Sequence, residues 1–433
     1  MYTKIRFSSI LFAFLWLTGI LCLCCACSGP VSIPDGTSAN SQDPTEPPSI
    51  EGTTACTDET AESASDKETE METNFDNLTT YRVTDMGGEE GLDFIIDFPI
   101  GKDLTILQIT DTQMQTMAGV RNEIRKIQVG NAFFSALPDD FEFRVWRYMD
   151  EAVEKSTPDL IVLTGDNIYG ELDDSGEMWL ALIEKMDSYG IPWCTVFGNH
   201  DNESGKGVQW QVEQLLASEY CIFRQGTMSG NSNYNLLIRQ GGEAKYLFYM
   251  MDSNGCTTKP NNPGEGMMPD NVDIDKIQQA AGFRNDQIAW LNKSAKNIRK
   301  THGEVPVLLF YHIPVIDIAQ IILQTYPSAG RTLPFSPDQE GDFGMAKEVI
   351  SGVAGDRFWK TAKSIGCTGM FVGHQHKVAT SIVCDNIRVT YGLKTGTYDY
   401  HDEDLLGATK ITLSESGGEF EVEYLYSELL YKE

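Results

Sequence analysis

Short apolar runs separated by stretches of helical spacing are the feature that most constrains the fold of this chain. Runs of strand length lie at residues 104–109, 160–163 and 193–197, and the stretches 143–155 and 178–186 carry apolar residues three and four positions apart. Strand–helix–strand units of this length are typical of α/β domains with parallel strand pairs. The chain is therefore predicted to form an α/β domain.

More strands are expected further along the chain. Apolar strand patterns follow at 234–238, 246–251 and 307–310, with a helix expected at 287–299. The C-terminal part changes character and holds successive strand patterns between residues 369 and 426. The strand content therefore exceeds that of a single small parallel sheet.

Polar side chains follow five of these predicted strands directly. They are Asp111 and Gln113 after the first strand, Asp166 after the second, Asn199, His200 and Asp201 after the third, His312 after the strand at 307–310, and His374 and His376 after the strand that begins at 369. Ligands of α/β sheets bind beyond the carboxyl ends of the strands, so these side chains are expected to meet. A single Asp after a strand is more often a turn residue. However, four of the six histidines of the chain fall in these motifs, which indicates one shared site.

The acidic charge of the chain is concentrated near its N-terminus. Residues 30–100 hold 17 Asp and Glu against two Lys and Arg, which accounts for half of the formal net charge of −30. A basic surface for duplex nucleic acid is not expected. An acidic chain can still take an anionic substrate, because bound cations invert the local field.

The N-terminus has the pattern of an export signal. Lys4 and Arg6 precede an apolar run over residues 10–23, which is short for a membrane span. The sequence that follows, Cys-Cys-Ala-Cys-Ser, resembles a bacterial lipoprotein cleavage box with Cys27 as the lipidated residue and Cys25 as an alternative. The expectation is an exported bacterial protein anchored at the cell surface by lipid, with free secretion as the alternative.

Three segments are expected along the chain. Residues 1–27 form the lipoprotein-type signal peptide, 28–100 an acidic flexible linker and domain entry, and 101–433 one domain. Residues 28–80 are rich in Ser, Thr, Pro, Gly and acids and cannot bury enough apolar surface to fold. Six cysteines remain after the signal segment, without CxxC spacing, so one or two disulfides are the most that is expected.

The ordered motifs resemble those of the calcineurin-like metallophosphoesterase family, in which DxH, GDxx, GNHD or GNHE, a lone His and GHxH follow one another. The sequences TGDNIYG at 164–170, GNHDNES at 198–204 and FYHIP at 310–314 are most similar to the purple-acid-phosphatase-like branch. The resemblance implies a four-layer α/β/β/α sandwich with two central mixed β-sheets.

The resemblance also implies a two-metal centre of divalent or mixed-valence ions, such as Fe, Mn or Zn, with Ca as a further candidate. Asp166 is expected to bridge the ions. Asp111 and His376, with Gln113 at the position where the family has His, would bind the first ion, and Asn199, His312 and His374 would bind the second. His200 would donate a proton to the leaving oxygen or stabilise developing charge, and Asp201 would orient the His200 ring by a hydrogen bond.

Gln113 departs from the family pattern. An amide oxygen is a harder and weaker ligand than imidazole, which leaves three alternatives: weaker binding of the first ion, preference for a harder ion, or a ligand from elsewhere. Tyr169 is the candidate for that ligand, because Gly165-Asp-x-x-Tyr169 matches the motif whose tyrosinate binds ferric iron in purple acid phosphatases. The alternative is a packed or substrate-facing tyrosine.

The expected activity is metal-dependent hydrolysis of phosphoric esters, in which a water or hydroxide shared by the metals attacks phosphorus. A phosphomonoesterase acting on a phosphorylated small molecule is favoured, and a phosphodiesterase acting on nucleotides or lipid headgroups is the alternative. A non-catalytic lipoprotein that binds a phosphorylated ligand is the alternative of another class.

Overall fold

The computed structural model shows that Met71–Glu433 form one compact unit. The structure describes residues 78, 80–116, 141–172, 175–255, 281–325, 333–334 and 342–428. The expected signal peptide, the lipidation candidate Cys27 and most of the expected linker lie outside the described residues.

In the described part of the chain, ten strands form one mixed sheet in the order β1-β2-β6-β7-β8-β11-β13-β12-β10-β9. The pairs β2–β6, β7–β8, β8–β11 and β11–β13 are parallel, and the other pairs are antiparallel. These strands are β1 (Arg82–Asp85), β2 (Phe94–Phe98), β6 (Tyr234–Gln240), β7 (Glu243–Met250), β8 (Val307–Phe310), β9 (Leu333–Pro334), β10 (Phe343–Ala346), β11 (Cys367–Val372), β12 (Val378–Cys384) and β13 (Ile387–Tyr391).

A second mixed sheet has five strands within the same described ranges, in the order β15-β14-β3-β4-β5. They are β3 (Leu104–Ile109), β4 (Leu160–Leu163), β5 (Trp193–Thr195), β14 (Gly407–Leu413) and β15 (Phe420–Tyr426). The pairs β3–β4 and β4–β5 are parallel, and β14 pairs antiparallel with both β3 and β15.

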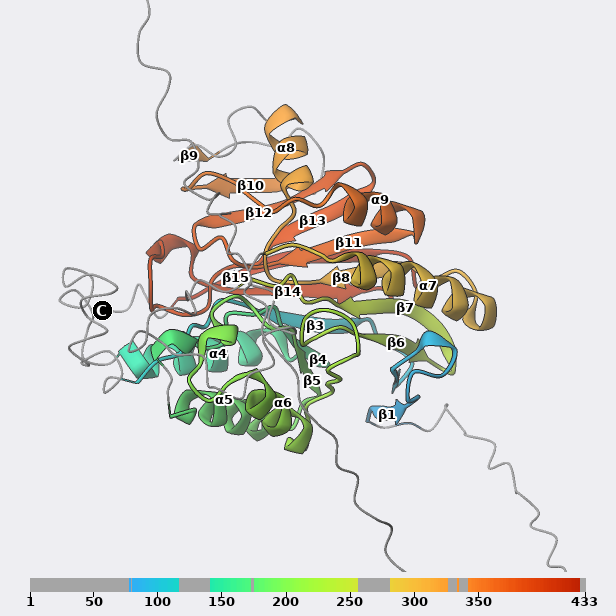
Figure 1. Cartoon of the computed structure of the whole chain (residues 1–433), viewed down its shortest axis with the longest axis horizontal. Helices are drawn as coiled ribbons and strands as arrows, with labels where there is room; N and C mark the ends of the chain where they lie inside the picture. Colours follow the sequence, from blue (N-terminus) through green and yellow to red (C-terminus); the bar gives the residue numbers. More distant parts are fainter. Residues whose placement is uncertain are drawn as a thin grey trace, which may run out of the picture. The chain divides into compact units, whose positions relative to one another are not determined.

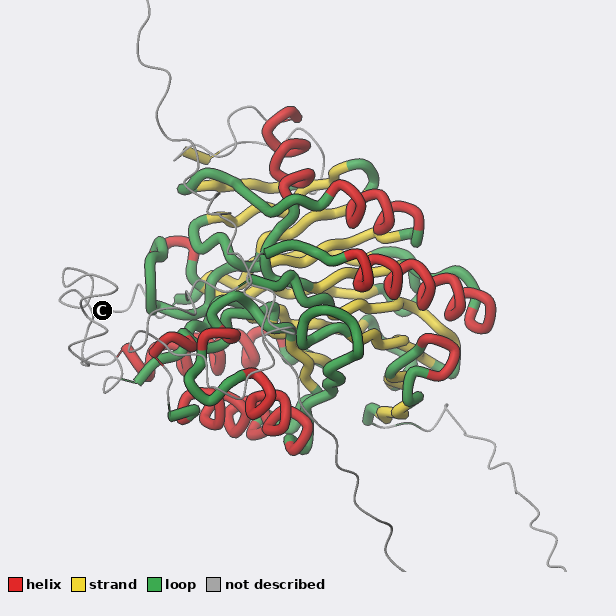
Figure 2. The backbone as a smooth tube through the Cα atoms, in the orientation of Figure 1, coloured by secondary structure: helices red, strands yellow, loops and turns green. Residues whose placement is uncertain are grey.

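Helices cover the outer faces of both sheets (Figures 1 and 2). They are α4 (Phe141–Ser156), α5 (Glu177–Ser188), α6 (Val208–Ala217), α7 (Asn285–His302), α8 (Ile316–Thr325) and α9 (Asp356–Ser364), with short 3₁₀ helices η2 (Glu89–Gly91), η3 (Gly170–Leu172), η4 (Asp201–Glu203) and η5 (Glu403–Leu405). Helices α4 to α6 pack with the five-stranded sheet, and α7 to α9 pack on the ten-stranded sheet. The expected four-layer α/β/β/α sandwich is confirmed.

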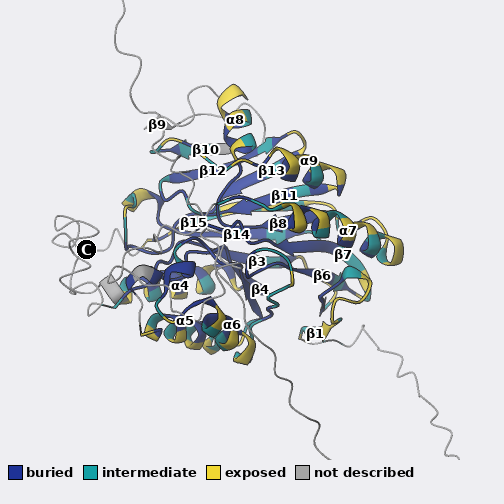
Figure 3. Ribbon diagram, viewed as in Figure 1, coloured by how far each residue is buried: buried dark blue, intermediate teal, exposed yellow. Residues whose placement is uncertain are grey.

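The central strands of the large sheet are buried on both faces (Figure 3). On β7, Phe248 and Met250 belong to the core shared with the other sheet, whereas Leu247 and Tyr249 belong to the core under α7 to α9. Successive strand residues point to opposite faces, so a strand covered on both sides must be apolar at nearly every position. This requirement explains why the central strands appear in the sequence as continuous apolar runs.

The folded unit begins upstream of residue 101, where the sequence had placed the start of the domain. Strand β2 is buried along its whole length, pairs in parallel with β6, and carries β1 on its other edge. Residues 82–85 and 94–98 of the expected linker and domain entry therefore belong to the sheet. The partner of β2 lies about 140 residues away, so the local pattern did not reveal the pairing.

Two further expectations concern the membrane and the thiols. No helix in the described ranges combines the length and apolarity needed to cross a bilayer. Among the described cysteines, Cys194, Cys221, Cys367 and Cys384 are free thiols. Cys56 and Cys256 lie outside the described residues.

Candidate metal centre

The polar motifs meet at one end of the sandwich, where both sheets contribute strands. Asp111 follows β3, Asp166 follows β4 and Asn199 follows β5 of the five-stranded sheet. His312 follows β8 and His374 follows β11 of the ten-stranded sheet. All of these strands direct their carboxyl ends to the same place, which is the usual ligand position of parallel α/β sheets.

Among the described residues, two clusters of ligand atoms share the carboxylate of Asp166. One consists of Asp166, His312 and His374, and the other of Asp111, Asp166 and His376. Within each cluster the ligand atoms all lie within 4.8 Å of one another. Two adjacent clusters bridged by one carboxylate have the arrangement that a pair of metal ions requires.

Several buried polar atoms at this point have no hydrogen bond, and this observation tests whether the residues suit a metal pair. They are Asp111 Oδ1, Asn199 Oδ1 and His312 Nε2. His312 Nε2 lies 3.1 Å from Asp166 Oδ2, but without the geometry of a hydrogen bond. Buried polar atoms are normally paired, so converging unpaired acceptors indicate the position of a cation. The donor set of carboxylate, amide oxygen and imidazole suits Mn, Fe or Zn.

The histidine rings are oriented by hydrogen bonds from their other nitrogen. His312 Nδ1 lies 2.8 Å from the carbonyl oxygen of Thr164, and His376 Nδ1 lies 2.7 Å from that of Tyr400. A carbonyl oxygen only accepts, so Nδ1 carries a proton and Nε2 is the nitrogen that faces the cluster and would bind an ion. Such outer contacts fix the tautomer of a ligating histidine.

The backbone at the centre is held in an unusual conformation. Among the described residues, Asp111, Gln113, Asp166 and His374 have positive φ angles between 42° and 70°. Left-handed conformations of non-glycine residues cost on the order of 1–3 kcal/mol each and cluster at functional sites. Four strained positions therefore meet at the candidate centre, although non-glycine residues elsewhere in the described ranges, such as Glu90 and Thr157, also have positive φ angles.

One motif glycine is required for close approach. A Cβ on Gly198 would lie 2.2 Å from both the backbone nitrogen and Oδ1 of Asp166. No side chain fits at this distance. Gly198 therefore allows the loop after β5 to pass directly against the bridging carboxylate.

The carboxylates of Asp111 and Asp166 and the imidazole of His312 shift one another's pKa values strongly. Burial alone raises the pKa of Asp111 and Asp166, but His312 and the other histidines outweigh it and lower both values. Burial lowers the pKa of His312, whereas Asp166 and Asp111 raise it to about 9. Burial and the neighbouring His312 lower the pKa of His374 to about 4. The carboxylates are thus ionised at neutral pH, as metal binding requires.

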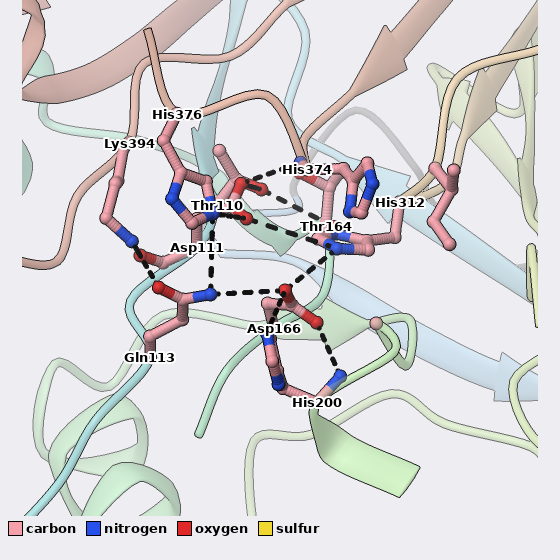
Figure 4. A network of polar contacts seen from close by, with 12 residues as sticks. Thr110, Asp111, Gln113, Thr164, Asp166, His200, His312, His374, His376 and Lys394 are labelled. Carbon is pink, nitrogen blue, oxygen red and sulfur yellow. Dashed lines mark hydrogen bonds and ion pairs between the residues drawn. The ribbon is translucent and has the colours of Figure 1, made fainter. Parts of the chain in front are cut away.

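Gln113 does not present its oxygen to the clusters. Its Oε1 accepts a hydrogen bond of 2.6 Å from Lys394 Nζ, while its Nε2 lies 3.3 Å from Asp166 Oδ2 and 3.4 Å from His376 Nε2 (Figure 4). Lys394 is buried, and burial lowers its pKa to about 8 although Asp111 and Asp399 raise it. The expected oxygen ligand is therefore turned away from the ligand atoms.

His200 lies beside the bridging carboxylate, and its ring partner corrects one expectation. Its Nδ1 is 2.7 Å from Glu203 Oε2, and its backbone nitrogen donates to Asp166 Oδ1 at 2.9 Å. Glu203, not Asp201, thus orients the imidazole. His200 caps the 3₁₀ helix η4, and side chains three positions apart eclipse in a 3₁₀ helix, whereas the next residue points elsewhere.

Asp201 instead joins two motif loops. Its Oδ2 accepts from the side-chain amide of Asn167 and from the Gly198 backbone, and its Oδ1 accepts from the Ile168 backbone. Burial, aided by the charge of Asp166, raises its pKa to about 7 against the effect of these hydrogen bonds. The role of Asp201 in this structure is to hold the loops after β4 and β5 together.

Aromatic rings pack against His200 and His376. The Tyr169 ring stacks on the imidazole of His200 at 4.2 Å and meets Tyr398 edge to face. Tyr400 stacks on His376 at 4.2 Å. These contacts support the interpretation of Tyr169 as a packed tyrosine, and its role as a ligand of ferric iron stays a prediction.

The sequence pattern of one family covers all of the motifs. The calcineurin-like phosphoesterase pattern matches residues 104–378, which is more than half of the chain and includes every candidate ligand of the two clusters. This chain belongs to the calcineurin-like phosphoesterase family. The family uses a dimetal centre, in agreement with the two clusters that share Asp166.

Related proteins of Arabidopsis thaliana are named as purple acid phosphatases. "Probable inactive purple acid phosphatase 28" is 25% identical over 278 residues, which are 61% of this chain and 65% of that protein. "Probable inactive purple acid phosphatase 29" is 24% identical over 326 residues, 70% of this chain and 74% of that protein. Among solved structures, a dimetal phosphatase from Danio rerio is 13% identical and covers 76% of this chain and 100% of its own, with a TM-score of 0.40.

The sequence analysis predicted that the ligand candidates lie together, but it missed three residues that contact them, which are Glu203, Tyr400 and Lys394. The spacing of three residues between His200 and Glu203 was a signal that could have identified Glu203. Tyr400 lies in the aromatic stretch after the last motif strand. Lys394 had no local signal, because an isolated lysine is usually solvent-exposed.

Proposed function

We propose that this chain is a metal-dependent phosphatase that hydrolyses phosphate monoesters of small molecules. The observation that carries the proposal is the pair of ligand clusters that share Asp166, with the His200 imidazole beside that carboxylate. Asp111, Asp166 and His376 would hold one ion, and Asn199, His312 and His374 would complete the site of the other with Asp166. Two dications there would neutralise phosphate oxygens and lower the pKa of water.

His200 is suited to protonate the leaving oxygen. Its Nδ1 is engaged by Glu203, so its Nε2 faces the clusters, 4.0 Å from Asp166 Oδ2. Burial lowers the pKa of His200, but Glu203 and Asp166 raise it to about 10. A raised pKa keeps the imidazole protonated at neutral pH, so a proton is available where the ester oxygen would leave.

Charge favours a monoester over a diester. A monoester carries up to two negative charges, and the cationic His200 adds to the positive charge that two ions would bring. The alternative, a diesterase acting on nucleotides or lipid headgroups, uses the same clusters. A diester substrate has a second ester group, which a diesterase must accommodate beside the clusters.

A non-catalytic phosphate-binding protein is the second candidate, and the orientation of Gln113 favours it. The amide oxygen is taken by Lys394, so the first cluster has three protein ligands. Loss of one ion would leave an anion-binding site without a complete two-metal centre.

One experiment separates these candidates. The full-length chain, purified in detergent and stripped of metal, is supplied with Mn, Fe, Zn or Ca and tested on p-nitrophenyl phosphate and bis(p-nitrophenyl) phosphate. The monoester should be cleaved faster, and His200→Ala should lower kcat for phenyl phosphate, whose more basic leaving oxygen depends on the proton, by about 10²–10⁴-fold with metal content retained. Faster cleavage of the diester would support the diesterase. Binding of inorganic phosphate without cleavage of either ester under any metal would support the binding protein.

We further propose that the chain is exported and anchored by lipid at Cys27. Support comes from the basic n-region, the apolar run and the Cys-Ala-Cys-Ser sequence. Mass spectrometry of the mature N-terminus should find a diacylglyceryl group on Cys27. An unmodified N-terminus in the culture medium would contradict anchoring.

A further inference from the structure

Lys394 is a buried cation next to the first ligand cluster, and it lies beyond the part of the chain that the family pattern matches. Its side chain is 1% exposed. Its backbone is held in bridges to Thr110 on one side and Leu406 on the other. The ammonium donates to Gln113 Oε1 at 2.6 Å and to the Asp111 carbonyl oxygen at 3.0 Å. Its position is therefore set by the fold.

The ammonium determines which end of the Gln113 amide faces the cluster. A lysine ammonium has three donors and no acceptor, so the amide must turn its oxygen toward Lys394. The Nε2 group then lies 3.3 Å from Asp166 Oδ2 and 3.4 Å from His376 Nε2. His376 Nδ1 donates to the Tyr400 carbonyl, so its Nε2 can accept from the amide. The contacts of the amide with Lys394 and with Asp166 both require this orientation.

An amide N–H cannot ligate a cation, so the two clusters are chemically unequal. The first cluster has Asp111, Asp166 and His376, with an N–H group where a fourth ligand would be and a buried positive charge behind it. The second cluster has Asp166, His312 and His374, and Asn199, the expected further ligand of this ion, has a buried and unpaired Oδ1.

We infer that the Lys394–Gln113 pair makes the centre asymmetric, so that the second cluster binds its ion tightly and the first cluster binds weakly with three protein ligands. Lys394 acts here as a positioning residue. It withholds the Gln113 oxygen and repels a cation at the first cluster. The centre would hold one ion at low metal concentration and two only at higher concentration. This inference concerns metal binding and does not depend on turnover.

Titration of the metal-free full-length chain with Mn²⁺ tests the inference. Calorimetry, together with the electron paramagnetic resonance signal of free Mn²⁺, should show one tight ion and one bound at least about tenfold more weakly. Lys394→Met frees the Gln113 oxygen and removes the buried charge. It should tighten the weak site by about 10–100-fold, the range over which outer contacts change metal affinity. Gln113→His should also tighten it while retaining Lys394.

Matched variants assign the effect. Lys410→Met removes the same charge from β14, where the ammonium pairs with Glu423, and should leave both affinities unchanged. His376→Ala should abolish the weak ion and His374→Ala the tight one. Two equal Kd values in the unmodified chain, or unchanged weak binding in both folded Lys394→Met and Gln113→His, would overturn the inference. Because the titration counts ions, its outcome is independent of whether any ester is cleaved.

Discussion

Replacement of Glu203 by glutamine should separate the protonation of His200 from metal binding. The Glu203 side chain is 0% exposed and that of His200 is 12% exposed, so the solvent screens their contact little. Glu203 belongs to neither ligand cluster. The substitution keeps the size of the side chain and an oxygen that can accept from His200 Nδ1, and it removes only the charge.

The expected magnitude follows from the contact distance. Two unit charges 2.7 Å apart attract by about 6 kcal/mol at an effective dielectric constant of about 20. Charge-assisted hydrogen bonds are about twice as strong as neutral ones, so a glutamine oxygen retains roughly half, and about 3 kcal/mol is lost. This loss lowers the pKa of His200 by about two. His200 then stays protonated at neutral pH, so kcat there should be retained, and the alkaline pH above which kcat declines should move down by about two units.

The assay compares two monoesters that differ in leaving group. Phenyl phosphate releases a more basic oxygen than p-nitrophenyl phosphate, so it depends more on the proton. At alkaline pH, where only the variant loses the His200 proton, Glu203→Gln should therefore slow phenyl phosphate more than p-nitrophenyl phosphate, with Mn²⁺ content unchanged. Isotope-labelled histidine NMR should show the lowered His200 titration, which is practical because the chain has six histidines.

Asp201→Asn is the matched control. Asp201 accepts hydrogen bonds from three groups of the two motif loops, so this variant should lose about 1–3 kcal/mol of folding free energy without a change in leaving-group preference. The reasoning would be refuted if Glu203→Gln slowed both esters equally or neither, while Asp201→Asn produced the selective loss.

Three further predictions concern the metal centre. Removal of metal by EDTA should abolish activity and lower Tm, because the buried atoms Asp111 Oδ1, Asn199 Oδ1 and His312 Nε2 would lose the ion that they bind. Addition of Mn²⁺ should restore both activity and Tm. An unchanged Tm would argue against a structural contribution of the ions. Burial lowers the pKa of His312, but Asp166 and Asp111 raise it to about 9, so below that pH metal binding should release a proton. Calorimetry at pH 7.5 in buffers of different ionisation enthalpy should detect this release, which should vanish as the pH rises above about 9. Gly198→Ala places a Cβ 2.2 Å from Asp166 Oδ1, so Mn²⁺ affinity should fall at least about tenfold in a folded protein, and normal affinity would show that the loop can move aside.

The α/β class and the convergence of the motifs could be predicted because both depend on local order in the chain. Continuous apolar runs mark strands buried on two faces, and a residue just after a parallel strand must lie at its carboxyl edge. Asp166 and His312 were placed correctly on this basis. Strands β1 and β2 were not placed in the sheet, since β2 joins it by pairing with β6 about 140 residues away, which leaves no local pattern, and β1 is attached only through β2.

The partner of His200 shows where local reasoning fails. Asp201 is adjacent in sequence and of the right chemistry, yet a 3₁₀ turn directs it to the loop of Asn167 and brings Glu203 to the imidazole instead. The choice between the two carboxylates depends on a backbone conformation three residues long, which residue types alone do not specify.

By itself, the sequence determined which residues are available as ligands and that they follow strands whose carboxyl ends share one edge, because residue type and strand pattern are local properties of the chain. Only the tertiary structure decided that Gln113 turns its oxygen away from the ligand clusters. That orientation depends on Lys394, 281 positions along the chain, whose ammonium the packing of both sheets brings to the amide. An amide has a donor end and an acceptor end of nearly equal shape, so only the neighbour supplied by the fold can determine which end faces a metal.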